Sequence, residues 1–105
     1  MKKNALIICS HPDDEVLGCG GTIDNLRNKY NFFCIHLTKG GAKRTKKELS
    51  KKKIETNKAK KILGIKKIFN SDFPDNAMDG VNLIEIIQYI EGIIFKVKPE
   101  LIFTH

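Results

Sequence analysis

Hydrophobic residues along the chain fall into four short runs, separated by longer segments in which they recur at helical spacing. The runs cover residues 5–9, 32–37, 66–69 and 101–103, and each has the length of a β-strand. The first run is apolar throughout, which is typical of a strand whose two faces are both covered. The pattern therefore predicts four strands, with the first at the centre of the sheet.

The segments between these runs predict three helices. Residues 18–29 carry Ile23 and Leu26 in a mixed polar setting, which indicates a short helix. Residues 46–63 form a longer helix that is almost wholly cationic on its outer face and ends before Gly64, a plausible C-cap. Its expected inner face is made of apolar or small residues, namely Leu49, Thr56, Ala59, Ile62 and Leu63.

The clearest helix runs from Leu83 to Val97, where isoleucines recur at steps of three and four until Pro99 stops the helix. Asn82 and Glu85 resemble a capping box at its start. Strands that alternate with helices predict an α/β fold, here a Rossmann-like three-layer sandwich with a mainly parallel sheet of about four strands. Ligands bind such sheets at the carboxyl ends of the strands, so the loops after the four strands are the candidate sites.

The composition is that of one globular domain spanning residues 1–105. The chain has 105 residues, of which 41% are hydrophobic and 30% charged, so it excludes two catalytic domains and intrinsic disorder. Its longest apolar stretch falls short of the about 20 residues that cross a bilayer, and its first apolar run lacks a small-residue cleavage site. Three widely spaced cysteines contain no C-x-x-C pair. We expect a cytoplasmic protein with no membrane span.

The net charge of +7 is concentrated in residues 43–67, which hold twelve basic residues against Glu48 and Glu55. Such a field attracts nucleic acid, anionic lipid or an acidic substrate. The stretch lacks a nucleic-acid-binding signature and interleaved aromatic residues, so nucleic acid is the less favoured partner and a solvated helix face is preferred. A non-catalytic basic module that binds nucleic acid or an anionic surface through residues 43–67 is the alternative function.

Candidate chemistry follows the first strand, where His11, Asp13, Asp14 and Glu15 stand within five residues. Three adjacent carboxylates repel each other, so a fold that gathers them balances them with a cation, such as a divalent metal, or lets one take up a proton. His11 and Asp14 are three residues apart across a turn stiffened by Pro12, so both can face one ion. An imidazole nitrogen with a carboxylate oxygen suits zinc, or less securely iron or manganese.

A metal at this loop indicates a hydrolase. Asp13, between the two candidate ligands, is free to hold a water molecule and accept its proton. Glu15 would orient the ligands without binding the metal, or would cap the following helix. Without a metal, the same histidine ends a strand and the same acids cap a helix, which are ordinary surface roles.

The loop and the residues after it resemble the signature of the PIG-L/LmbE-like deacetylases. These are zinc-dependent enzymes that remove N-acetyl groups from glucosamine-containing substrates. The resemblance begins in residues 11–15 and 18–23 and continues, more weakly, through residues 37–40, 55–64, 73–76 and 99–105. It therefore spans the whole chain.

The resemblance implies zinc bound by His11 and Asp14, Asp13 as general base, and Asp75 near the hydroxyls of the sugar. The implied reaction is attack of an activated water on an acetamide carbonyl, which yields acetate and a free amino sugar. The substrate would be an N-acetylglucosamine-type sugar or its conjugate. A metal-dependent hydrolase that cuts a different bond would share the same loop.

The sequence departs from the family pattern at three places. Gly41 stands where an acid is usual, and Lys52 stands where an arginine is common. Family members are longer, and their third zinc ligand is a histidine in an Asp-His pair beyond the position of His105. A histidine at the end of the chain is expected to be too flexible to replace it, so truncation should impair activity. The unpaired sheet edge would also favour a homo-oligomer.

The remaining candidates are interpreted as structural. Gly18, Gly20 and Gly21 do not match a dinucleotide loop and are expected to allow close packing of the helix on the sheet. His36, inside the second strand, is a satisfied structural histidine, and Cys9 and Cys19 are small buried residues.

Overall fold

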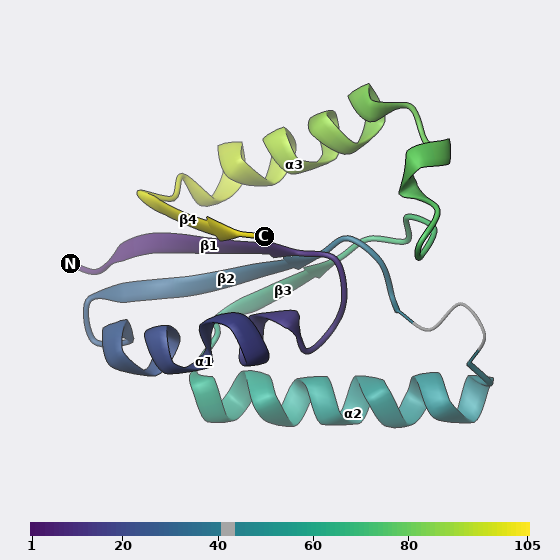
Figure 1. Cartoon of the computed structure of the whole chain (residues 1–105). Helices are drawn as coiled ribbons and strands as arrows, with labels where there is room; N and C mark the ends of the chain where they lie inside the picture. Colours follow the sequence, from purple (N-terminus) through teal and green to yellow (C-terminus); the bar gives the residue numbers. More distant parts are fainter. Residues whose placement is uncertain (41–43) are drawn as a thin grey trace.

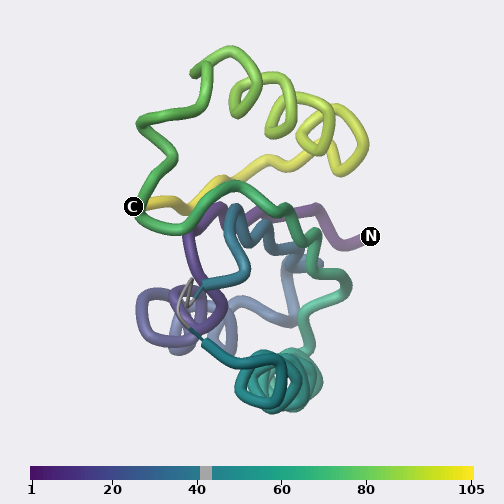
Figure 2. Tube along the Cα trace, turned by 90° about the vertical axis from the view of Figure 1, so that its right-hand side faces the viewer, coloured from purple at the N-terminus to yellow at the C-terminus, as the bar shows by residue number. Residues whose placement is uncertain are grey.

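The computed structural model describes residues 1–40 and 44–105 and contains a four-stranded parallel sheet in the order β3-β2-β1-β4. Helix α3 covers one face of the sheet, and helices α1 and α2 lie on the other (Figures 1 and 2). The elements in chain order are β1 (Lys3–Cys9), α1 (Asp14–Leu26), β2 (Tyr30–His36), α2 (Lys46–Leu63), β3 (Lys67–Asn70), the 3₁₀ turn η1 (Met78–Gly80), α3 (Leu83–Val97) and β4 (Leu101–Thr104). The predicted three-layer α/β fold is confirmed, with β1 as an inner strand.

Alternate residues of β1 and β2 build a hydrophobic core on each face of the sheet. Ala5, Ile7 and Phe32 belong to the core that contains Ile23 of α1. The intervening residues belong to a second core, which includes Leu6, Ile35, Ile93 and Val97. Both faces of β1 are therefore removed from water, which explains its unbroken apolar run. Each large side chain buried in this way contributes about 1.5–3 kcal/mol of transfer free energy.

Helix α1 begins at Asp14, four residues before the start that periodicity predicted. The acidic residues Asp14 and Glu15 occupy its first turn, where negative charge interacts favourably with the helix dipole. Apolar spacing carries no information about such a polar first turn. The expected close packing at the glycines is wrong, because a Cβ atom added at Gly18 or Gly21 would meet nothing within 4 Å.

Helix α2 has the predicted bounds, and four of its five predicted inner-face residues, Leu49, Thr56, Ala59 and Leu63, are half-buried. Thr45 caps its start by accepting a hydrogen bond from the backbone N–H of Glu48 at 3.2 Å, and Gly64 ends it in the left-handed conformation. Every residue of α2 is at least partly exposed, and Ile62 is 75% exposed. Leu63 packs against the core, and a cavity lies between the helix and β3.

Helix α3 packs through its C-terminal half. Ile93 and Val97 are buried, whereas Leu83 is 69% exposed, and Figure 1 shows the helix rising away from the sheet at its start. The predicted capping box is wrong, because the Asn82 side chain makes no capping hydrogen bond. The backbone carbonyl of Asn82 accepts from Glu85 instead, at 2.9 Å. In the described part of the chain, every helix is too short or too polar to cross a bilayer.

Two glycine substitutions should change stability in opposite directions. Gly64 has a φ of 74°, so Gly64→Ala should lower the free energy of unfolding by about 1 kcal/mol. Gly21→Ala should raise it by about 0.5–1 kcal/mol, because Gly21 lies inside α1 with open space around it. Urea unfolding of both variants measures the effects. If both substitutions changed the free energy of unfolding equally, the left-handed conformation at Gly64 would be contradicted.

Candidate active site

The loop that follows β1 brings His11 and Asp14 together at the carboxyl edge of the sheet. Nδ1 of His11 lies 3.5 Å from Oδ2 of Asp14, and the backbone N–H of His11 donates to the same oxygen at 3.0 Å. The other ring nitrogen, Nε2, lies 2.5 Å from Oδ1 of Asp75, which reaches the loop from the segment between β3 and η1. The imidazole of His11 is therefore held between two carboxylates.

His105 approaches the same carboxylate from the end of β4. Its Nε2 accepts a hydrogen bond from the backbone N–H of Ser10 at 3.2 Å and lies 3.5 Å from Oδ2 of Asp14. The nitrogen that accepts from an N–H carries a lone pair, the form in which imidazole binds metals. From the sequence, His105 was expected to be too flexible to act as the third zinc ligand. Parallel pairing of Ile8 with Thr104 explains its placement, because it brings the next residue of each strand side by side.

Asp13 occupies the N-cap position of α1 without acting as a cap. Its φ is 100°, a left-handed conformation that is costly for a residue with a side chain. Its side chain makes no capping hydrogen bond and instead pairs with the ammonium group of Lys52 from α2. The carboxylate remains 47% exposed. Lys52, one of the departures from the family pattern, thus contacts the expected general base.

Glu15 points away from this edge into the core beneath it. Its Oε2 lies 2.7 Å from Nε2 of His36 and 3.8 Å from Sγ of Cys9. The sulfur of Cys34 lies 3.9 Å from that of Cys9. We call these four residues, Cys9, Glu15, Cys34 and His36, the buried cluster. Glu15 was expected to support the metal ligands or to cap α1, and its described contacts are with this cluster.

The ionisable groups of the buried cluster shift each other's pKa values. A hydrogen bond from Cys34 lowers the pKa of Cys9 to about 6, against the opposing effect of burial. The same hydrogen bond and burial raise the pKa of Cys34. Burial favours neutral His36, but hydrogen bonds with Cys9 and Glu15 outweigh it and raise its pKa to about 9. The cluster therefore favours a thiolate beside an imidazolium.

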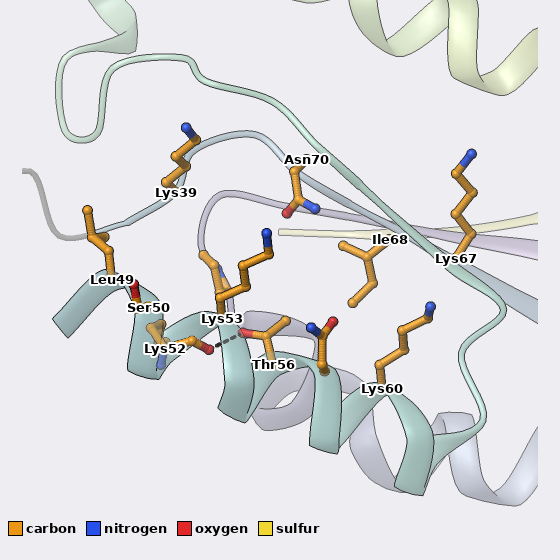
Figure 3. A pocket seen from close by; sticks show the side chains of 12 residues that line it. Lys39, Leu49, Ser50, Lys52, Lys53, Thr56, Lys60, Lys67, Ile68 and Asn70 are labelled. Atoms are coloured by element: carbon orange, nitrogen blue, oxygen red, sulfur yellow. Dashed lines mark hydrogen bonds between the residues drawn. The ribbon is translucent and has the colours of Figure 1, made fainter. Parts of the chain in front are cut away.

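A basic cavity of about 590 Å³ opens beside the loop, between α2 and the edge strand β3. Pro12, the residue after His11, contributes to the wall of this cavity. Figure 3 shows lysine side chains from both sides of the cavity. The lysines that line it are Lys39, Lys52, Lys53, Lys60 and Lys67. Some lysines of the cationic segment therefore line a cavity, whereas we expected them to lie on a solvated helix face. Gly41 and Lys43, which the sequence analysis singled out, lie outside the described residues.

Comparison with known proteins identifies relatives of the chain. Residues 6–105 match the family described as PIG-L, GlcNAc-PI de-N-acetylase. Diacetylchitobiose deacetylase of Thermococcus kodakarensis is 32% identical over 95% of this chain and 39% of its own length. A probable N-acetyl-alpha-D-glucosaminyl L-malate deacetylase of Bacillus cereus is 28% identical over 99% of this chain and 52% of its own. The chain thus spans about half or less of these relatives.

A solved structure has the same fold. The N,N'-diacetylchitobiose deacetylase of Pyrococcus horikoshii superposes with a TM-score of 0.75 at 25% identity. The match covers 95% of this chain and 39% of that protein.

The opposing pKa shifts in the buried cluster should make stability nearly independent of pH between about 6.5 and 9 in metal-free protein. The raised pKa of His36 stabilises the fold below its unfolded value of 6.5, and this contribution is lost as pH rises through about 9. The lowered pKa of Cys9 stabilises above its unfolded value of 9.0, and this contribution is lost as pH falls through about 6. Between these limits one contribution grows as the other declines.

Cys9→Ser keeps a hydrogen-bonding side chain but removes the thiol's titration. The substitution also removes one of the two hydrogen bonds that raise the pKa of His36, so only the part sustained by Glu15 remains. We expect the free energy of unfolding to fall as pH rises over the lower part of this window. Urea unfolding at several pH values, with a chelator present, measures the slope. A Cys9→Ser profile as flat as that of the unsubstituted protein would contradict the charge-separated state.

Proposed function

Because the chain belongs to the PIG-L family, we propose that it hydrolyses the N-acetyl group of an N-acetylglucosamine-type sugar or its conjugate. The observation that carries the proposal is the meeting of His11, Asp14 and His105 beside Asp13 at the carboxyl edge of the sheet. Two relatives are named as deacetylases of N-acetylated sugars, which supports the substrate class.

Two pairs of donor atoms at this edge have separations that suit a zinc ion. With metal–nitrogen and metal–oxygen bonds of about 2.0–2.1 Å, the ligand atoms of a tetrahedral site lie about 3.3 Å apart. His11 Nδ1 and His105 Nε2 each lie 3.5 Å from Asp14 Oδ2. His11 and Asp14 would hold the ion, and His105 is the neighbouring imidazole that would complete three protein ligands. Iron or manganese accepts a similar donor set.

Asp75 supports the orientation of His11. Ligating histidines usually donate their second ring N–H to a carboxylate, and the 2.5 Å contact to Asp75 has this form. It turns Nδ1 toward Asp14. The resemblance also implies that Asp75 accepts hydrogen bonds from the sugar, and the two roles use different lone pairs of one carboxylate.

Asp13 is the general base of the proposed reaction. Its carboxylate takes a proton from the attacking water, the water oxygen bonds to the acetamide carbon, and the C–N bond breaks with a proton passing to the amine. When bound, zinc would polarise the carbonyl oxygen and acidify water. The ion pair with Lys52 and the strained backbone at Asp13 both hold the carboxylate away from the helix end.

The basic cavity favours a substrate that carries a negative charge beside the amino sugar. Lys53 and Lys60 extend from α2 toward the sheet in Figure 3, and Pro12 joins the cavity to the acidic loop. A concave site of this size suits a small anion. The non-catalytic alternative, binding of nucleic acid or an anionic surface, would use the same lysines without the acidic loop.

Asp13→Asn should reduce acetate release from N,N'-diacetylchitobiose by about 100-fold or more, because the amide cannot accept the proton. The zinc requirement and the thermal midpoint should stay near those of the unsubstituted protein. Asp79→Asn, on an exposed residue of η1, is the matched control and should keep full activity. Undiminished acetate release by Asp13→Asn would exclude the role of Asp13 as general base. A purely basic binding module would release no acetate, and its affinity for an anionic ligand would be unchanged by the substitution.

Asp75→Asn should raise the zinc concentration needed for half-maximal acetate release by about 10–100-fold, since His11 loses its supporting carboxylate. A zinc titration of the chelated protein measures this. Asp72→Asn, three residues away and paired with Lys39 at the surface, should leave the zinc requirement unchanged. If Asp75→Asn changed only the KM for the sugar, the carboxylate would serve the substrate alone.

A further inference from the structure

The buried cluster lies beneath the candidate active site and has the composition of a metal site of its own. One donor atom from each of Cys9, Glu15, Cys34 and His36 lies within 4.8 Å of every other. All four residues are 3% exposed or less. They come from three different elements, β1, α1 and β2. Two sulfurs, one imidazole and one carboxylate form a donor set that favours zinc or another thiophilic cation.

The spacing of the donor atoms agrees with tetrahedral zinc. With zinc–sulfur bonds of about 2.3 Å, two thiolates are about 3.8 Å apart, and a thiolate and a carboxylate oxygen about 3.5 Å apart. The corresponding distances are 3.9 Å between Cys9 and Cys34 and 3.8 Å between Cys9 and Glu15. The 2.7 Å contact of His36 with Glu15 is shorter, and it would open by about 0.6 Å when an ion separates the two atoms.

The hydrogen bonds of the metal-free cluster leave part of it unsatisfied. Among the described residues, Nδ1 of the fully buried His36 has no hydrogen-bond partner. The Cys9 sulfur makes contacts of 3.5 Å with the carbonyl of Ile35 and 3.8 Å with that of His11, and thiols are weak donors. Burial of polar groups with weak partners costs stability, and coordination would satisfy the sulfurs and the carboxylate more strongly.

We propose that Cys9, Cys34, His36 and Glu15 form a second, structural metal site that binds Zn²⁺ beneath the catalytic loop. Four protein ligands fill a tetrahedral shell and leave no position for substrate, which is the arrangement of structural zinc. Binding forms two zinc–sulfur bonds and releases to solvent the thiol proton of Cys34 and the imidazolium proton of His36. The ion joins the ends of β1 and β2 to the first turn of α1 and so fixes the loop between them. The proposal is independent of the deacetylase function.

Cobalt substitution tests the site, because Co²⁺ bound to thiolates has a charge-transfer absorption that His/Asp sites lack. With Co²⁺ added under a non-thiol reductant, this absorption should be present in the unsubstituted chain and in His11→Ala. It should disappear in Cys34→Ala. Cys19→Ala is the matched control, because Cys19 is the remaining cysteine and lies only partly buried on α1. Absence of the band from the folded unsubstituted chain, or its survival in Cys34→Ala, would overturn the proposal.

A second measurement leaves the cysteines intact. X-ray absorption of zinc-loaded His11→Ala should show sulfur ligands at about 2.3 Å, and nitrogen and oxygen ligands alone would overturn the site. Zinc should also raise the thermal midpoint of His11→Ala by several degrees, since an ion that binds only the folded state stabilises it. If acetate release fails while these signals persist, the proposed function is wrong and the structural site stands.

Discussion

The parallel pairing of β1 with the strands on both its sides is the constraint on which the rest of the structure depends. Cys9 pairs with His36 in β2, and Ile8 pairs with Thr104 in β4. The first pairing assembles the buried cluster, and the second delivers His105 to Ser10. A shift of either register by one residue would turn the affected side chains to the opposite face of the sheet. Both groups of donor atoms are thus consequences of strand register.

Three consecutive acids escape mutual repulsion because the chain changes direction between them. Asp13 has a left-handed backbone and faces Lys52, Asp14 lies between two imidazoles, and Glu15 is buried against His36. Successive helical residues point about 100° apart, so the start of α1 sends the last two in different directions. Each carboxylate obtains its own cationic or polar partner, and one short loop serves both the edge of the sheet and the core.

Local signals predicted the elements better than their packing. The bounds of α2 followed from Gly64 and the lysine-rich composition before it, which are local signals. The inner face of α2 was predicted correctly except at Ile62, which is 75% exposed, because helical spacing does not show where an apolar stripe ends. His36 was expected to be a satisfied structural histidine; it is buried in β2, but its Nδ1 has no hydrogen-bond partner among the described residues. Cys34, two residues before it, carried no signal that it would approach Cys9 from another strand.

The sequence alone determined the alternation of strands and helices, the parallel α/β fold and the acidic loop at a strand end, because periodicity, capping residues and the PIG-L signature are local properties of the chain. Tertiary structure decided how residues distant in the sequence contact that loop. Asp75 and His105 are 64 and 94 residues from His11, and the buried cluster joins residues 9–15 to residues 34–36. Contacts of such separation depend on strand order and register, which form only when the whole sheet assembles.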